Sequence, residues 1–314
     1  ILRTVNGVHT CAVPISIVWL FRKDVVELPG KLEKICDNKL DKLSIKTSAE
    51  AAVIIEALQG GRTQVEAVEE KQTKKTPPTP LTTSTLQIDA NTKLGMSAKA
   101  TMRLAQQLYE TGRITYMRTD SLNLAEKFLS EAQTYIKSNF GERYATGAQR
   151  YRTNKKGAQE AHEAIRPTSA RATPASLKSE LEPRAWKLYD LIWRRALASQ
   201  MPAAELNRTT VDLIANEYTF RANGSTILFD GFMKVYQSAK EKLLPTLKKG
   251  DAVETTSITP TQHFTEPPAR YSDATLVKTL EEHGIGRPST YAPTITTIID
   301  RGYVERDDNK KLAP

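Results

Sequence analysis

The sequence predicts a mixed α+β protein of several domains, in which β-rich parts flank a helical insertion and a partial winged-helix-like segment follows. Between residues 76 and 201, apolar side chains recur at the spacing of amphipathic helices. After Pro202 they alternate with polar residues, which is typical of antiparallel strands. After Ser272 the helical spacing returns on both sides of a glycine turn, as in a helix-turn-helix.

The predicted domain boundaries follow these changes of pattern. We assign residues 1–14 to an N-terminal segment of uncertain structure. Residues 15–75 and 202–270 form one discontinuous β-rich domain. Residues 76–201 form a helical domain inserted into it, and 271–314 form a partial helix-turn-helix-like domain.

Charge and cysteine content exclude several classes of protein. Lys and Arg total 45 against 36 for Asp and Glu, so the net charge is +9 and favours a polyanion such as nucleic acid over a membrane surface. No stretch approaches the ~20 apolar residues of a membrane span. Two cysteines are too few for a disulfide scaffold or a four-ligand zinc site. We expect a cytoplasmic monomer without a membrane partner.

The first half of the chain carries two helix signals and a connector. The spacing predicts a helix over 48–58, with Ser48 as its cap. The lysine- and proline-rich stretch 71–80 indicates a connector, because proline removes backbone donors. A second helix is predicted over 97–110, with Ser97 as its cap.

Further elements follow in order. Asn123 and Glu126 resemble a capping box that opens a helix. Another helix is predicted over 183–198. In the β-rich part, Asn223-Gly224 is a hairpin-turn signal between two alternating runs.

The densest polar cluster spans residues 114–121. In an extended segment, Tyr116 and Arg118 point to the same side. A guanidinium can bind two phosphate oxygens, so Tyr116 could attack phosphorus while Arg118 holds the charge that builds there. Thr119 and Asp120 also belong to this cluster. From spacing alone, a packed tyrosine beside a solvated arginine is the more frequent explanation.

A second cluster contains His162 and Arg166 in a basic stretch. They are four positions apart, so a helical turn would put both on one face, where they could bind a phosphate. A local hydrogen-bonding role for His162 is the alternative. A zinc-protease H-E-x-x-H motif is excluded, because Arg166 stands at the second histidine position.

The third cluster is the glycine turn 284–291. Free N–H groups at a helix start bind phosphate oxygens, and the turn adds the side chains of Arg287, Ser289 and Thr290. Arg301 follows at the end of the next helix. An ordinary capped turn explains this pattern about equally well.

Taken in order and spacing, these segments resemble bacterial DNA topoisomerase I of type IA. The resemblance rests on residues 81–87, 115–121, 161–167, 267–272 and 284–291. It covers about 81–306 and is weaker before residue 75. It implies that the β-rich domain is a hinge or arch and that the helical domain carries a catalytic tyrosine.

The resemblance also implies residue roles. Tyr116 matches the nucleophile that becomes joined to the 5′ phosphate of a single DNA strand, and Arg118 matches the arginine that stabilises that phosphate. His162 and Arg166 match residues that contact the DNA backbone near the site. The remaining candidate DNA contacts are Thr119, Asp120, Arg287, Ser289, Thr290 and Arg301.

The family pattern has parts with no counterpart in this sequence. The resemblance implies Mg²⁺ bound by an acidic Toprim domain, which we do not find, so no metal ligand is assigned here. No ATP is expected, in agreement with the lack of a G-x-x-x-x-G-K motif, and no zinc is expected in this chain. We interpret the chain as the central part of a larger enzyme, with the missing Toprim domain as partner. Alone it should bind single-stranded DNA without relaxing supercoils.

Two alternatives come from other classes. A tyrosine recombinase also combines Tyr, His and Arg, but there the tyrosine normally follows the other two, whereas Tyr116 precedes His162. A non-catalytic DNA-binding module would explain the charge and the glycine turn. It would leave Tyr116 and Arg118 without a role.

Overall fold

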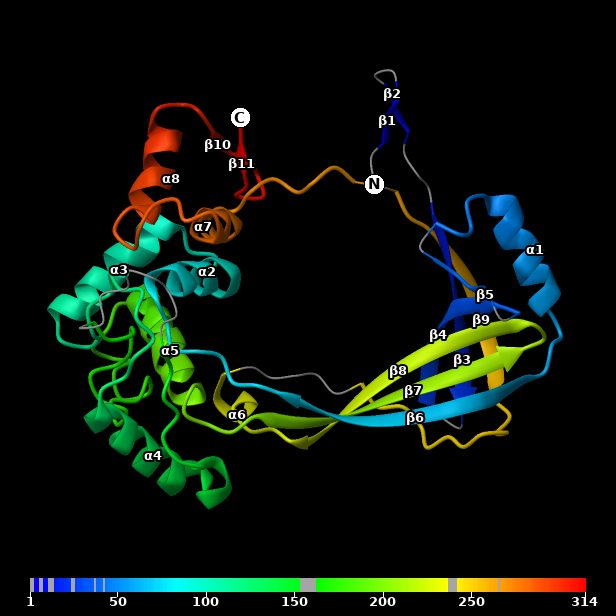
Figure 1. Cartoon of the computed structure of the whole chain (residues 1–314), viewed down its shortest axis with the longest axis horizontal. Helices are drawn as coiled ribbons and strands as arrows, with labels where there is room; N and C mark the ends of the chain where they lie inside the picture. Colours follow the sequence, from blue (N-terminus) through cyan, green and yellow to red (C-terminus); the bar gives the residue numbers. More distant parts are fainter. Residues whose placement is uncertain are drawn as a thin grey trace. The chain divides into compact units, whose positions relative to one another are not determined.

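The computed structural model describes residues 3–5, 8–10, 14–23, 26–36, 38–41, 43–152, 162–236, 242–264 and 266–314. The chain divides into two compact units (Figure 1). The first unit comprises Ile1–Lys74, Glu205–Phe229 and Lys240–Ala269. The second comprises Lys75–Ala204, Asp230–Ala239 and Arg270–Pro314. The predicted helix-turn-helix segment therefore belongs to the same compact unit as the helical insertion.

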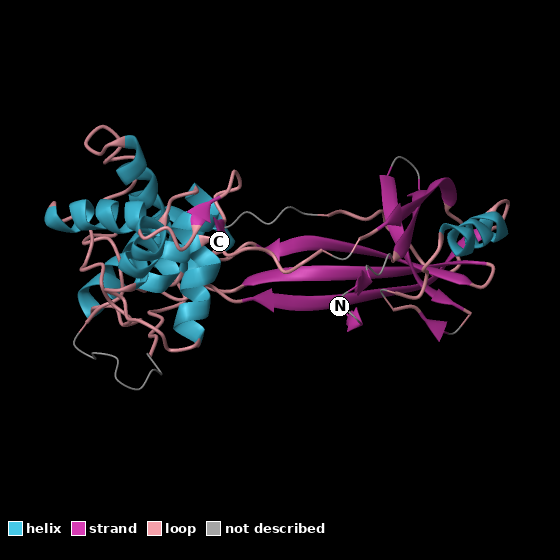
Figure 2. Ribbon diagram, turned by 90° about the horizontal axis from the view of Figure 1, so that it is seen from above, coloured by secondary structure: helices cyan, strands magenta, loops and turns pink. Residues whose placement is uncertain are grey.

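The first unit is built on a seven-stranded sheet with the order β6-β7-β8-β4-β3-β9, in which β5 pairs with β4. Its strands are magenta in Figure 2. The pairs β3–β4, β3–β9, β4–β8 and β7–β8 are antiparallel. The strands are β3 Ile15–Lys23, β4 Val26–Ile35, β5 Asn38–Lys39, β6 Thr63–Lys75, β7 Ala204–Ala215, β8 Tyr218–Phe229 and β9 Glu254–Gln262. A separate hairpin joins β1 Arg3–Val5 to β2 Val8–Thr10.

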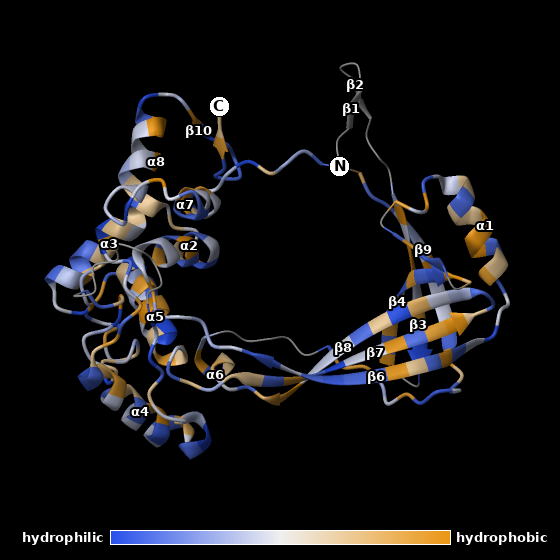
Figure 3. Ribbon diagram, viewed as in Figure 1, coloured by the Kyte–Doolittle hydropathy of each residue, from blue (hydrophilic) through white to orange (hydrophobic). Residues whose placement is uncertain are grey.

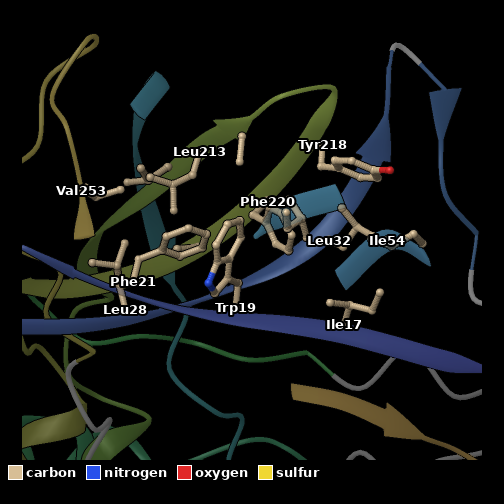
Figure 4. Packing of buried hydrophobic residues seen from close by; sticks show 14 of the residues in the cluster. Ile17, Trp19, Phe21, Leu28, Leu32, Ile54, Leu213, Tyr218, Phe220 and Val253 are labelled. Atoms are coloured by element: carbon tan, nitrogen blue, oxygen red, sulfur yellow. The ribbon is translucent and has the colours of Figure 1, made fainter. Parts of the chain in front are cut away.

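The core of this unit is formed by the apolar side chains that alternate with polar ones along the strands. Figure 3 shows this alternation of hydropathy. On β3, every second side chain from Ile15 to Phe21 is buried. Trp19 and Phe21 meet Phe220 of β8 with ring centroids 5.3 and 5.6 Å apart (Figure 4). Gly30 faces this cluster, where a Cβ atom would lie 2.6 Å from the Phe21 ring.

Helix α1, Ser48–Leu58, adds Ile54 and Leu58 to this core, as its spacing predicted. Its cap is Thr47 rather than Ser48. The Thr47 side chain accepts from the amide of Glu50, whose carboxylate accepts from the Thr47 amide in return. The prediction of the cap was therefore wrong by one position.

Two predictions about the strands were also wrong. The hairpin between β7 and β8 turns at Asn216, which has φ 52°, and not at Asn223-Gly224. Gly224 lies inside β8 opposite Thr209, where a Cβ atom would meet Leu244 at 2.6 Å. The predicted connector 71–80 begins later than expected, because β6 continues to Lys75.

The second unit consists mainly of helices. They are α2 Thr83–Leu94, α3 Ala98–Glu110, α4 Glu126–Phe140, the 3₁₀ helix η1 Glu142–Tyr144, α5 Pro183–Ala198, α6 Met233–Tyr236, α7 Asp273–Glu282 and α8 Tyr291–Asp300. A short hairpin joins β10 Glu305–Arg306 to β11 Leu312–Ala313. Across the described part of the chain, no helix is long and apolar enough to cross a membrane.

Local signals set most of these helices. Ser97 caps α3, as predicted, Ser272 caps α7, and Pro183 stands in the first turn of α5. The capping box predicted at Asn123 and Glu126 is absent from the structure. Helix α4 begins after Ala125, which provides no side-chain cap.

A buried carboxylate joins α7 to α3. Asp273, which is 1% exposed, accepts a hydrogen bond from the Ala98 amide at 2.7 Å. Its other oxygen lies 2.7 Å from Arg306. Asn91 of α2 accepts a hydrogen bond from the amide of Ala274, which fixes α7 from a second side. The first turn of α7 is thereby fixed to α2 and α3.

Candidate active site

The segment between α3 and α4 presents Tyr116 and Arg118 to the outside. Tyr116 is 42% exposed, whereas Met117 is 1% exposed and Thr119 is 2% exposed. Arg118 is exposed as well. This alternation is the one expected for an extended segment, and it places both candidate side chains on one side of the chain.

A buried hydroxyl on α2 fixes the backbone on both sides of Arg118. Thr83 Oγ1 donates to the carbonyls of Met117 at 2.7 Å and Thr119 at 3.0 Å, and it accepts from the Thr119 amide at 2.8 Å. The Thr83 amide also donates to the Thr119 carbonyl at 2.9 Å. The first turn of α2 therefore determines the position of Arg118.

A second set of bonds fixes the backbone before Tyr116. The Thr115 amide donates to the Arg166 carbonyl at 2.9 Å, and the Arg166 amide donates to Thr115 Oγ1 at 3.0 Å. Thr115 Oγ1 donates in turn to the Ala164 carbonyl at 2.7 Å. Tyr116 is thus held between two hydrogen-bonded anchors although its own ring is exposed.

The segment that contains His162 is extended and not helical. Ile165 forms a bridge with Leu81, and Pro167 forms one with Ile114. The prediction that a helical turn places His162 and Arg166 on one face was wrong. Pairing with residues on both sides of the tyrosine segment supplies the backbone hydrogen bonds that a helix would otherwise satisfy.

This pairing brings three aromatic rings together. The Tyr116 ring lies 5.3 Å from that of Tyr109 and 6.4 Å from that of His162, measured between centroids, and both pairs meet edge to face. Tyr109 comes from the last turn of α3 and is itself 41% exposed. The two neighbouring rings restrict the directions that the Tyr116 hydroxyl can take.

Arg166 is turned to other partners. Its side chain is 11% exposed and lies 2.6 Å from Glu163, with a further bond to the Pro167 carbonyl. Its guanidinium carbon also lies 4.8 Å from the centroid of the Phe128 ring. The structure therefore brings His162 to the tyrosine, whereas the Arg166 guanidinium pairs with Glu163.

The glycine turn and α8 contribute residues near Arg118. Arg118 and Ser289 line the same groove of about 350 Å³ between α3 and α8. Thr290 uses its hydroxyl within the turn, where it accepts from the Arg287 amide at 2.8 Å. The Arg287 side chain is exposed. Arg301 is exposed and is the C-cap residue of α8, and it is not one of the residues that line the groove.

Asp120 is electrostatically linked to α8. Burial raises the pKa of Tyr291, the negative charges of Glu281 and Asp120 raise it further, and Arg287 opposes them. The charge of Asp120 therefore acts on Tyr291, which lies in the first turn of α8. Thr119, by contrast, is buried and uses its hydroxyl to accept from the Ser121 amide at 3.0 Å.

The described residues do not provide a metal site. Among them, no group of three or more His, Cys, Asp or Glu side chains could hold a metal ion. The described residues thus do not fit the Mg²⁺ that the family resemblance implies.

Comparison with known proteins gives the family. A family model described as DNA topoisomerase matches residues 19–314. This chain belongs to that family. The resemblance seen in the sequence motifs is therefore confirmed, and the tyrosine recombinase alternative is excluded.

Individual topoisomerases support the same conclusion. DNA topoisomerase 1 of Rickettsia felis is 45% identical over an alignment of 303 residues that covers 91% of this chain and 39% of that protein. The Rickettsia bellii protein of the same name is 46% identical and is covered to 38%. Full-length topoisomerase I from Thermotoga maritima superposes with a TM-score of 0.82 at 32% identity, over 97% of this chain and 49% of that one. The chain thus spans less than half the length of these topoisomerases.

Sequence reasoning missed several residues around the tyrosine. Thr83, Thr115 and Tyr109 were not assigned a role, and neither were Lys99 and Met102, which line the groove beside Arg118. The spacing of α3 puts Tyr109 on the same face as its apolar residues, and only the structure shows that its ring is exposed. The threonines gave no such signal, because their roles depend on pairing between segments far apart in sequence.

Proposed function

We propose that this chain supplies the nucleophile half of a type IA topoisomerase, which cleaves one DNA strand, passes another through the gap and reseals the break. The observation that carries the proposal is the joint presentation of Tyr116 and Arg118 by a segment fixed at both ends. In the complete protein this cycle relaxes negative supercoils. It needs no ATP, because the phosphotyrosyl bond conserves the energy of the broken phosphodiester.

The cleavage step is a transesterification. The Tyr116 hydroxyl oxygen attacks the phosphorus, the bond from phosphorus to the 3′ oxygen breaks, and the phosphate stays on the 5′ oxygen of the retained strand. The tyrosine loses a proton and the released 3′ hydroxyl gains one. Resealing is the reverse reaction, so atoms and charge balance over the cycle.

Arg118 and His162 have distinct roles in this proposal. Arg118 stabilises the charge on the non-bridging oxygens, which increases as the phosphorus becomes five-coordinate. His162, next to the Tyr116 ring, contacts the DNA backbone at the scissile phosphate. The hydrogen bonds from Thr83 and Thr115 hold the attacking group in place before the substrate arrives.

Further DNA contacts are proposed for the exposed turn and the end of α8. The residues concerned are Arg287, Ser289, Thr290 and Arg301, together with Thr119 and Asp120. For Arg166, a DNA phosphate would have to share the guanidinium with Glu163, since that ion pair is already formed. Single-stranded DNA is the proposed partner, and the chain acts as a monomer.

The arrangement of domains is part of the same proposal. The first unit would act as hinge and arch, and residues 271–314 as a winged-helix-like DNA-binding part. A Toprim domain outside this chain would bind Mg²⁺ and complete the active site.

A covalent-adduct assay tests the proposed function. Labelled single-stranded oligonucleotide and Mg²⁺ are mixed with this chain, alone and with a Toprim domain from a relative. We expect a 5′-linked adduct only when the Toprim domain is added, and none with Tyr116→Phe. Tyr271→Phe is the matched control, because Tyr271 is also an exposed tyrosine of the second unit.

The outcomes separate the alternatives. An adduct that persists in Tyr116→Phe would refute the assignment of the nucleophile. An adduct with the chain alone would show that Tyr116 and Arg118 suffice for cleavage. Unchanged DNA binding without any adduct, in either mixture, would favour the non-catalytic DNA-binding module.

A further inference from the structure

A groove in the second unit lies directly beside the segment that presents Tyr116. It runs between α3 and α8 and has a volume of about 350 Å³, which is at the small end of ligand pockets. Its lining includes Lys99, Met102, Arg118, Ser289, Ala292 and Thr296.

The chemistry of the groove suits one nucleotide. Among the described residues that line it there are two cations, Lys99 and Arg118, and no carboxylate. Ser289 and Thr296 add hydroxyl groups. Met102 and Ala292 provide an apolar floor, on which a base or sugar can pack. Cations and hydroxyls bind phosphate, so the lining matches both halves of a nucleotide.

The groove is firmly built. Ala292 is 6% exposed and belongs to a core cluster with Val277 and Ile295, against which Met102 is packed. Arg118 enters the groove from a backbone that Thr83 fixes on both sides. The positions of the floor and of one cation are therefore set before any ligand binds.

We propose that this groove holds the first nucleotide of the strand whose 5′ phosphate Tyr116 retains. The inference rests on the proposed function and adds a binding site to it. Arg118 is shared between the two: it serves the phosphate at Tyr116 and also lines the groove. When Arg118 binds the 5′ phosphate that Tyr116 retains, the first nucleotide of that strand can enter the groove. Lys99 then pairs with the same 5′ phosphate.

The groove would give the retained strand end a fixed place while the break is open. Covalent attachment alone leaves the nucleotide free to rotate about the phosphotyrosyl bonds. A bound first nucleotide keeps the phosphorus oriented for attack by the returning 3′ hydroxyl. Lys99 is accordingly a positioning residue and not a catalytic one.

Binding of strand ends to this chain tests the proposal without requiring cleavage. The probe is a short oligothymidylate with a 5′ phosphate and a 3′ fluorophore, measured by fluorescence anisotropy. Three comparison probes each change one feature. One has a 5′ hydroxyl in place of the 5′ phosphate, one lacks the base of its first nucleotide, and one carries the fluorophore at the 5′ end so that its 3′ hydroxyl end is free. We expect the 5′-phosphorylated probe to bind about fivefold more tightly than each of the others.

Lys99→Gln should weaken the binding of the 5′-phosphorylated probe about fivefold and should change the binding of the 5′-hydroxyl probe little. The matched control is Lys127→Gln, which removes the same charge from an exposed lysine of α4 in the same unit. Met102 is left unchanged, because it packs against the core. Lys99 is exposed, so its replacement leaves the core unchanged, and circular dichroism of both variants checks that they fold.

Three results would overturn the proposal. The first is that the native chain binds the 5′-phosphorylated and 5′-hydroxyl probes with equal affinity. The second is that Lys99→Gln and Lys127→Gln lose the same affinity for the 5′-phosphorylated probe, and the third is that the abasic probe binds as tightly as the 5′-phosphorylated probe. Failure here together with a normal Tyr116 adduct would reject the groove alone. Failure of the adduct assay would reject the proposed function itself.

Discussion

Replacing Thr83 with valine removes one buried hydroxyl from the site while preserving the shape of the side chain. That hydroxyl makes three hydrogen bonds to the segment of Tyr116 and Arg118. The Thr119 carbonyl keeps its bond from the Thr83 amide. The Met117 carbonyl and the Thr119 amide lose their partner. At about 1–3 kcal/mol for each buried group left unpaired, Thr83→Val should lower the free energy of unfolding by about 2–6 kcal/mol.

Unfolding of the second unit can be measured separately by tryptophan fluorescence. The chain has three tryptophans, and two of them, Trp186 and Trp193, lie on α5. In a Trp19→Phe background, tryptophan fluorescence during urea unfolding therefore reports on α5 alone. The free energy of unfolding from that signal measures the effect of the hydroxyl where it acts.

Thr134→Val is the matched control. Its hydroxyl also donates to a backbone carbonyl, that of Ser130, but it is exposed on α4. We expect a change within about 0.5 kcal/mol. In the adduct assay, Thr83→Val should reduce Tyr116 adduct formation more than it reduces strand binding. A loss of stability no larger than that of Thr134→Val would refute the reasoning that Thr83 fixes the site.

Further predictions concern stability, pH and salt. Asp273→Ala removes the buried partner of Arg306 and should lower the free energy of unfolding by about 3–5 kcal/mol in urea, whereas a change below about 1 kcal/mol would contradict the pair. Burial and a hydrogen bond to Asp230 raise the pKa of Tyr144 from 10.0 to about 12. Since the folded-state pKa is the higher one, this contribution to stability is complete below pH 10 and is lost as pH rises through about 12. The stability difference between native chain and Tyr144→Phe should shrink over that window, and a constant difference would argue against it. Affinity for single-stranded DNA should fall steeply with salt, because cations displaced from the phosphates are released on binding, and a flat salt dependence would exclude the basic surface as the contact.

Local signals predicted the elements that depend on neighbouring residues. The α5 helix agrees with its predicted range 183–198, and Ser97 caps α3 as expected. Alternation alone placed Tyr116 and Arg118 on one side of an extended segment, which their exposure confirms. Each of these features is set within a few residues, so a single sequence contains the information.

Contacts between distant segments decided the rest. His162 reaches Tyr116 because residues 165 and 167 pair with 81 and 114, and that pairing overrides the helical spacing of His162 and Arg166. Asn223-Gly224 has the composition of a turn, yet Gly224 is needed inside a strand where Leu244 approaches the backbone. Sequence by itself determined the family, the candidate nucleophile and most helices. The neighbours of that nucleophile were decided by tertiary structure, because a hydrogen bond between segments far apart leaves no periodic mark on either one.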